Sequence, residues 1–171
     1  GADIVVGIDQ TLLKRAREVA TYEPLGTPAF HGVDSALAFD ETQRFLPYDY
    51  GYLAVVYDDR RKNPPLAGTT FAALAENPLY RKRMVLEDPR TSSLGRSVLV
   101  WSQLLFPGKQ NAVFWKSMHT QTLTVSPGWS AAYGLFLNGE VDLTISYTTS
   151  PAYHIEKEGN SHIRALIFPE G

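Results

Sequence analysis

The sequence predicts an α/β fold with three layers: an open, largely parallel sheet with helices on both faces. Two observations predict it. Short apolar runs alternate with segments of helical periodicity about five times along the chain, as in βα units. The chain also has 171 residues, 44% of them hydrophobic, which is enough to bury a core.

The first segment predicts one βα unit followed by a long loop. Asp3 to Gly7 is apolar and ends in glycine, which is typical of a buried parallel strand. Asp9 can then cap a helix running to about Ala20. Residues 21–35 are rich in proline and glycine and predict a loop. We expect residues 1–48 to be an incomplete unit, because one strand and one helix bury too little surface.

Residues 49–171 predict a domain of their own. Strands are expected at Tyr52–Tyr57, Met84–Leu86, Leu123–Val125, Val141–Tyr147 and Ile163–Phe168. Helices are expected from Thr69 or Thr70 to Asn77, from Ser93 to Leu105, from Asn111 to Met118, from Trp129 to Asn138, and from the Thr-Ser-Pro at 149–151.

Composition excludes several function classes. The 16 basic and 18 acidic residues are well mixed and give a net charge of −2, so no nucleic-acid partner is expected. No apolar run approaches the ~20 residues of a membrane span. Cysteine is absent, and the four histidines lack metal-ligand spacing, so no metal site and no cofactor are expected.

A cluster of hydroxyl groups follows the strand that ends at Leu86. The segment EDPRTSSLG, residues 87–95, places Thr91, Ser92 and Ser93 at the start of a helix, where free backbone N–H groups can bind an anion. The alternative is an ordinary N-cap that satisfies the helix's own donors. Three hydroxyls exceed what one cap needs, so both interpretations stay open.

Three aromatic residues lie where strands meet helices in the last third of the chain. Trp129 follows a proline–glycine turn at a helix start, Tyr147 ends a strand, and Tyr153 lies on the next helix. Ligands bind at the carboxyl edge of such sheets, and aromatic rings there can hold a flat or cationic molecule. Packing in the core is the competing interpretation for each ring.

Catalysis has weak support in the sequence. No G-x-S-x-G nucleophile motif is present, and Asp88 near Ser92 is more simply part of a turn. His154, next to Tyr153, is the one residue we would test as a catalytic group. We therefore expect a binding protein rather than an enzyme.

Four segments, in order and at similar spacing, resemble a known family: PYDYGYLAVVYD, NPP, EDPRTSSLG and SPGWSAAYGLFLNGEVDLTISYTTSPAYH. They are similar to the thiamine-binding subunits of bacterial ABC importers, and GADIVVGIDQTLL resembles the strand and helix before the crossover in that family. The resemblance implies a type II periplasmic-binding fold, with residues 1–48 as part of lobe one and residues 49–171 as lobe two.

The resemblance also implies a function. A protein of this family binds thiamine or its phosphate esters in the periplasm and delivers them to a membrane permease. Ser92 and Ser93 match positions that hold the phosphate or hydroxyethyl end of the ligand. Trp129, Tyr147 and Tyr153 match positions that line it. Rings suit a flat thiazolium cation, and a hydroxyl-lined helix start suits a phosphate.

The chain is about half as long as members of that family, so we expect it to be a piece of a longer protein that holds part of a site. On its own it should bind the ligand weakly, and its exposed apolar surface should favour a homodimer.

Two alternatives stay open. One is a lobe for another solute, such as iron, phosphonate or another small anion, although the adjacent tyrosines of iron-binding relatives are absent at Tyr147-Thr148. The other is an enzyme of this fold acting on a thiamine precursor.

Overall fold

The computed structural model describes residues 2–26, 31–34 and 37–170. The chain divides into two compact units, Gly1–Tyr50 and Gly51–Gly171. This division lies two residues from the boundary predicted at 48/49. Part of the predicted loop, residues 27–30 and 35, lies outside the described residues.

The first unit contains a short helix, α1 (Leu13–Val19), and turns held by two aspartates. Asp9 accepts hydrogen bonds from the backbone N–H groups of Thr11 and Leu12, so it forms a turn and the helix begins four residues after it. Asp40 is buried and accepts from the backbone N–H groups of three residues, Thr42, Arg44 and Phe45.

The strand predicted at Asp3–Gly7 is wrong for this chain, because the segment has no regular structure. Ile4 and Val6 are 82% and 69% exposed. The physical reason is the lack of neighbours, since a strand is stable only when other strands satisfy its backbone and cover its apolar face. The described part of the first unit contains no strand.

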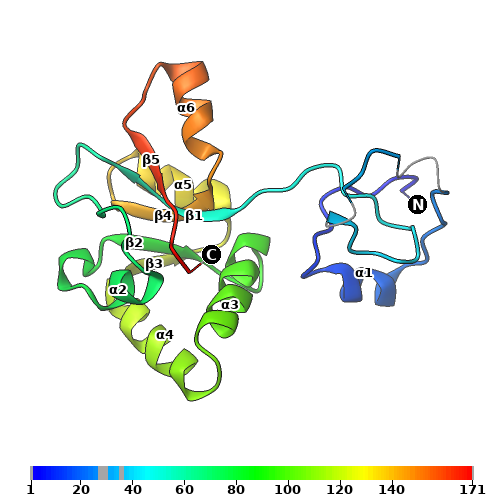
Figure 1. Cartoon of the computed structure of the whole chain (residues 1–171), viewed down its shortest axis with the longest axis horizontal. Helices are drawn as coiled ribbons and strands as arrows, with labels where there is room; N and C mark the ends of the chain where they lie inside the picture. The colour runs from blue at the N-terminus through cyan, green and yellow to red at the C-terminus, as the bar shows by residue number, and fades with distance from the viewer. Residues whose placement is uncertain (1, 27–30, 35–36, 171) are drawn as a thin grey trace. The chain divides into compact units, whose positions relative to one another are not determined.

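The second unit is built on one five-stranded sheet (Figure 1). The strands are β1 (Leu53–Asp58), β2 (Met84–Glu87), β3 (Thr122–Ser126), β4 (Leu143–Tyr147) and β5 (Ile163–Leu166). Their order across the sheet is β3-β2-β4-β1-β5. β2 is parallel to β3 and β4, whereas β1 is antiparallel to β4 and β5. Four strands therefore point the same way, and the prediction of a largely parallel sheet needs one correction, at β1.

Six helical segments complete the second unit: α2 (Phe71–Glu76), the 3-10 helix η3 (Pro78–Tyr80), α3 (Ser93–Leu105), α4 (Lys109–Gln121), α5 (Trp129–Leu137) and α6 (Ser150–Glu158). The four long helices and α2 each lie where the sequence predicts a helix. Thr70 caps α2 through its side chain, and the proline of α6 occupies the first turn, where its missing N–H costs nothing.

Two hydrophobic clusters lie on opposite faces of this sheet. The larger one packs α2, α3 and α4 on the sheet, with Phe71, Met84 and Met118 fully buried. The smaller one packs Phe136 of α5 on Val56 and Val85. The alternation of Met84 and Val85 between the two clusters follows from the period of two along a strand. Helices on both faces confirm the predicted three layers.

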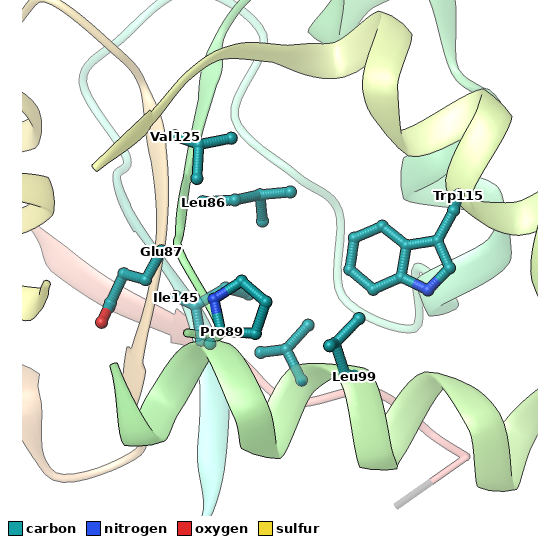
Figure 2. A pocket seen from close by; sticks show the side chains of 9 residues that line it. Leu86, Glu87, Pro89, Leu99, Trp115, Val125 and Ile145 are labelled. Atoms are coloured by element: carbon teal, nitrogen blue, oxygen red, sulfur yellow. The ribbon is translucent and has the colours of Figure 1, made fainter. Parts of the chain in front are cut away.

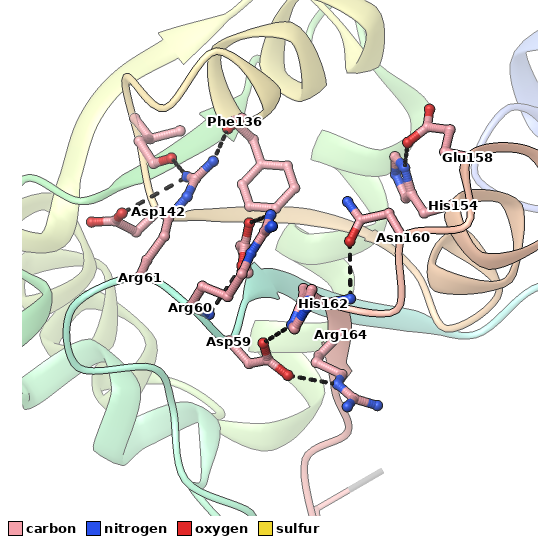
Figure 3. Close-up of polar contacts among 12 residues, drawn as sticks. Asp59, Arg60, Arg61, Phe136, Asp142, His154, Glu158, Asn160, His162 and Arg164 are labelled. Atoms are coloured by element: carbon pink, nitrogen blue, oxygen red, sulfur yellow. Dashed lines mark hydrogen bonds and ion pairs between the residues drawn. The ribbon is translucent and has the colours of Figure 1, made fainter.

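Salt bridges and hydrogen bonds close the amino edge of the parallel strands (Figure 3). Arg61 donates to the backbone carbonyls of Phe136 and Val141, and its guanidinium lies 4.7 Å from the Phe136 ring centroid. Asp58, at the end of β1, bonds Arg60. These contacts satisfy loop and helix-end carbonyls at the amino edge of the sheet.

Candidate functional site

The carboxyl ends of β2, β3 and β4 meet at one edge of the sheet, at Glu87, Ser126 and Tyr147. β1 begins at the same edge, because Leu53 pairs with Tyr147. The loops that follow these strands lead directly into α3, α5 and α6. In an open α/β sheet this edge is where ligands bind.

Ser92 is the N-cap of α3, and its hydroxyl accepts the N–H of Gly95 at 3.2 Å. Ser93 is the first helical residue and is half-buried. The hydroxyl of Thr91 donates to the carbonyl of Pro127 at 2.6 Å, which ties this loop to the loop before α5. The capping interpretation therefore holds for Ser92, and the second serine stands beside the N-terminal end of the helix.

Gly95 allows α3 to approach β2 closely. A Cβ atom at this position would lie 2.6 Å from the backbone oxygen of Glu87, closer than real contacts allow. Because the helix start is pressed against the strand end, the hydroxyls of residues 91–93 are held at the sheet edge by backbone geometry.

Trp129 is the first residue of α5 and is 42% exposed. Its indole N–H donates to the hydroxyl of Ser146 at 2.9 Å, and Ser146 in turn lies 2.7 Å from the hydroxyl of Ser150. The ring also stacks on Tyr133, with centroids 4.9 Å apart. Trp129 is thus fixed in orientation while one side of its ring faces solvent.

Tyr147 and Tyr153 are the other predicted aromatic residues. Tyr147 ends β4 with its ring against Gly51, where a Cβ atom would lie 2.8 Å from the ring. Tyr153 is 60% exposed on α6 and packs edge-to-face on His154, with centroids 5.7 Å apart. One edge of the sheet therefore carries four of the predicted site residues: Ser92, Ser93, Trp129 and Tyr147. Tyr153 is connected to Trp129 by a series of ring contacts through His154 and Tyr133.

His154, the residue considered for catalysis, is 2% exposed. One ring nitrogen lies 2.8 Å from the hydroxyl of Tyr133, and the other lies 2.7 Å from Glu158, as Figure 3 shows for Glu158. Burial raises the pKa of Tyr133 to about 12. Both nitrogens of His154 are engaged inside the protein, so the residue braces α6 against α5.

Two residues at this edge were not identified from the sequence, Glu87 and Ser146. Glu87 bonds the hydroxyl of Ser92, and burial raises the pKa of its carboxyl group, which the hydrogen bond from Ser92 opposes. Side chains alternate between the two faces along a strand, which could have placed both residues on the α5 face. Glu87 lies two residues after Val85, and Ser146 lies two residues after Thr144, the residue that pairs with Val85.

A cavity of about 240 Å³ lies on the other face of the sheet, between β2, α3 and α4 (Figure 2). Its lining is apolar apart from Glu87, whose carboxyl group points away from Trp115 and Leu99. Trp129, Tyr147 and Tyr153 are not among the lining residues. A polar cation would find few hydrogen-bonding groups there, so we place the candidate site at the carboxyl edge instead.

Within residues 2–26, 31–34 and 37–170, no group of three or more acidic or histidine side chains is arranged to hold a metal ion. No helix of the described residues is both long and apolar enough to cross a membrane.

Comparison with known proteins gives a consistent result. The thiamine-binding periplasmic protein of Brucella melitensis is 41% identical over 171 residues, which is 99% of this chain. A solved structure titled periplasmic thiamin binding protein matches 99% of the chain with a TM-score of 0.88 at 40% identity. The chain is a homologue of the thiamine-binding periplasmic proteins. No protein-family model matches it.

The chain spans about half the length of these thiamine-binding relatives, 49% of the Brucella protein and 52% of the solved structure. A ferric binding protein from Campylobacter jejuni matches with a TM-score of 0.69 at 12% identity and therefore shares the fold alone. These matches confirm the predicted periplasmic-binding fold, and the relatives are named as binding proteins.

Proposed function

We propose that this chain is the second lobe, with part of the first, of a periplasmic protein that binds thiamine or its phosphate esters and delivers them to the permease of an ABC importer. The 41% identity across the whole chain supports the ligand class. The observation that carries the proposal is Trp129, an exposed ring fixed by Ser146 at the carboxyl edge of the sheet.

Thiamine matches the chemistry of this edge. The molecule has two planar rings joined by a methylene group, and its thiazolium ring carries a permanent positive charge. An indole with one solvent-facing side attracts such a cation through its π electrons, a contact of about 0.5–2 kcal/mol. The N-terminus of α3, with Ser92 and Ser93, offers partial positive charge and donors to the phosphate or hydroxyl end.

We propose no catalytic step and no cofactor. His154 supports this, because both its ring nitrogens are occupied by Tyr133 and Glu158. The predicted homodimer is supported by neither the structure nor the relatives and stays a prediction.

Calorimetric titration of the full two-lobe protein proposed above tests the proposed ligand, because part of a site is expected to bind weakly on its own. Thiamine and thiamine monophosphate should each give saturable heats. Choline is the matched control, since it carries a permanent positive charge without aromatic rings, and it should bind at least about tenfold more weakly. Equal affinity for thiamine and choline, or no saturable binding of thiamine, would overturn the proposal.

A further inference from the structure

Glu87 is a buried acid beside the residues proposed to hold the anionic end of the ligand. It ends β2, is 6% exposed and pairs with Ser126 of β3. One carboxyl oxygen, Oε2, bonds the hydroxyl of Ser92. The other, Oε1, is buried without a hydrogen-bond partner among the described residues. An ionised carboxylate with an unsatisfied oxygen in such a place is costly.

The proton count at Ser92 depends on the state of Glu87. A serine hydroxyl has one proton to donate and two lone pairs. The N–H of Gly95 occupies one lone pair at 3.2 Å. If Glu87 is ionised, the Ser92 proton must point to Oε2, and none is left for a ligand. If Glu87 is protonated, it donates to the second lone pair, and the Ser92 proton becomes available to another acceptor.

The charge of Glu87 acts in the same direction. An ionised carboxylate bonded to Ser92 would repel a phosphate held by the same hydroxyl, whereas the neutral acid would not. Both effects favour an anionic ligand only when Glu87 carries its proton.

We propose that Glu87 is a proton-dependent positioning residue, which in its protonated form frees the Ser92 hydroxyl to donate to the phosphate of the ligand. This inference rests on the proposed function. It predicts that thiamine monophosphate is preferred over thiamine at acidic pH and that the preference declines as Glu87 ionises.

The surroundings of Glu87 favour the neutral acid. Burial raises the pKa of its carboxyl group, partly opposed by the hydrogen bond from Ser92. The charged and titratable groups on the neighbouring loop and helices each have a partner: Asp88 with Arg90, Arg96 with the carbonyl of Pro89, and His154 with Tyr133 and Glu158.

The test compares the protein with Glu87→Gln between pH 5 and pH 8. Glutamine has the same shape, stays neutral and donates to Ser92 as the protonated acid does. The measured quantity is the ratio of the dissociation constants of thiamine and thiamine monophosphate. In the unmodified protein this ratio should fall by about tenfold from pH 5 to pH 8, the size expected for a hydrogen bond to a charged group.

In Glu87→Gln the ratio should not fall. The second ionisation of the phosphate, near pH 6, adds negative charge in both proteins, so the comparison between them removes it. Glu140→Gln, an exposed acid on the loop after α5, is the matched control and should behave as the unmodified protein does. Ser92→Ala is a second variant, in which the preference at pH 5 should drop to the pH 8 value of the unmodified protein.

The outcomes separate the two proposals. If thiamine binds but the ratio has the same pH dependence in the protein and in Glu87→Gln, the role of Glu87 is refuted and the proposed function stands. If Glu87→Gln does not fold, an unchanged preference in Ser92→Ala refutes it instead. If neither ligand binds the unmodified protein, the proposed function fails, and this inference fails with it.

Discussion

The indole N–H of Trp129 donates to the hydroxyl of Ser146 at 2.9 Å, and this bond joins the start of α5 to the end of β4. It explains how a half-exposed tryptophan is held in one orientation. Ser146 itself is fully buried and is held by Ser150 at the start of α6. The bond connects two segments that the sequence identified separately, and the first prediction depends on it.

Trp129→Phe and Ser146→Ala should each weaken thiamine binding, because each removes the bond that orients the ring. The double variant should lose less than the sum, with a coupling of about 0.5–1.5 kcal/mol. Trp129→Ala should weaken binding by about 3–10-fold through loss of the ring. Calorimetry on the four variants and the unmodified protein measures these effects.

Trp115→Phe is the matched control, since Trp115 lines the apolar cavity on the other face of the sheet. It should leave thiamine affinity unchanged. Weaker binding in Trp115→Phe together with normal binding in Trp129→Phe would place the ligand in that cavity and contradict the site described above.

Gly95→Ala should destabilise the protein, because the added methyl group meets the backbone oxygen of Glu87. Forcing α3 away from β2 should lower the free energy of unfolding by about 1–3 kcal/mol, measured by urea denaturation. Gly134→Ala in α5 is the control. A Cβ there has nothing within 4 Å, so helix propensity should leave stability equal or raise it by up to about 1 kcal/mol. Equal stability of the two variants would show that α3 does not require this close approach.

Gly51→Ala should displace the ring of Tyr147, since the new methyl group would lie 2.8 Å from it. Thiamine affinity should fall several-fold, and the melting temperature should change little, because Tyr147 is a surface ring. The ring resonances of Tyr147 in NMR spectra report the movement. Unchanged resonances with reduced affinity would mean that Tyr147 is not the cause.

Asp58→Asn tests how much the ion pair between Asp58 and Arg60, at the amino edge of the sheet, contributes to stability at different pH values. The hydrogen bond from Arg60, opposed by burial, lowers the pKa of Asp58 from 3.8 to about 2. A lowered pKa means that the folded state binds fewer protons, so this stabilisation is present above pH 4 and is lost as the pH falls toward 2. Because Arg60 is 57% exposed, we expect only about 1–2 kcal/mol at pH 7.

Urea denaturation at several pH values measures the difference between Asp58→Asn and the unmodified protein. The difference in the free energy of unfolding between the two proteins should be largest at pH 7 and should decrease below pH 4. A difference that stays constant down to pH 2.5 would show that the ionised state of Asp58 contributes nothing to stability.

Most of the second unit could be predicted from its sequence, because local signals are strong there. Thr70 and Ser92 cap helices α2 and α3 at the predicted positions, and β-branched and aromatic residues mark β1. The direction of β1 could not be predicted. An isolated strand carries no signal for the strand it will pair with, and a long segment separates β1 from β4.

The first unit shows the opposite case. Asp3 to Gly7 has the composition of a buried strand, but composition gives only a preference for strand structure. A strand also needs neighbouring strands, and the described part of this unit contains none. At the site, the rings and hydroxyls could be found from their positions between strands and helices. The period of two along a strand predicts only the sheet face of Glu87 and Ser146; their importance depends on which residues of other elements face them, and the sequence does not show that.

The most direct test of the central claim is an NMR titration of the isotope-labelled protein with thiamine monophosphate, because chemical shifts report weak binding residue by residue. We expect saturable shifts of the indole N–H of Trp129, the amides of Ser92 and Ser93, and the ring of Tyr147, all with one dissociation constant. Shifts confined to the lining of the apolar cavity, or no saturable shift at this edge of the sheet, would contradict the account.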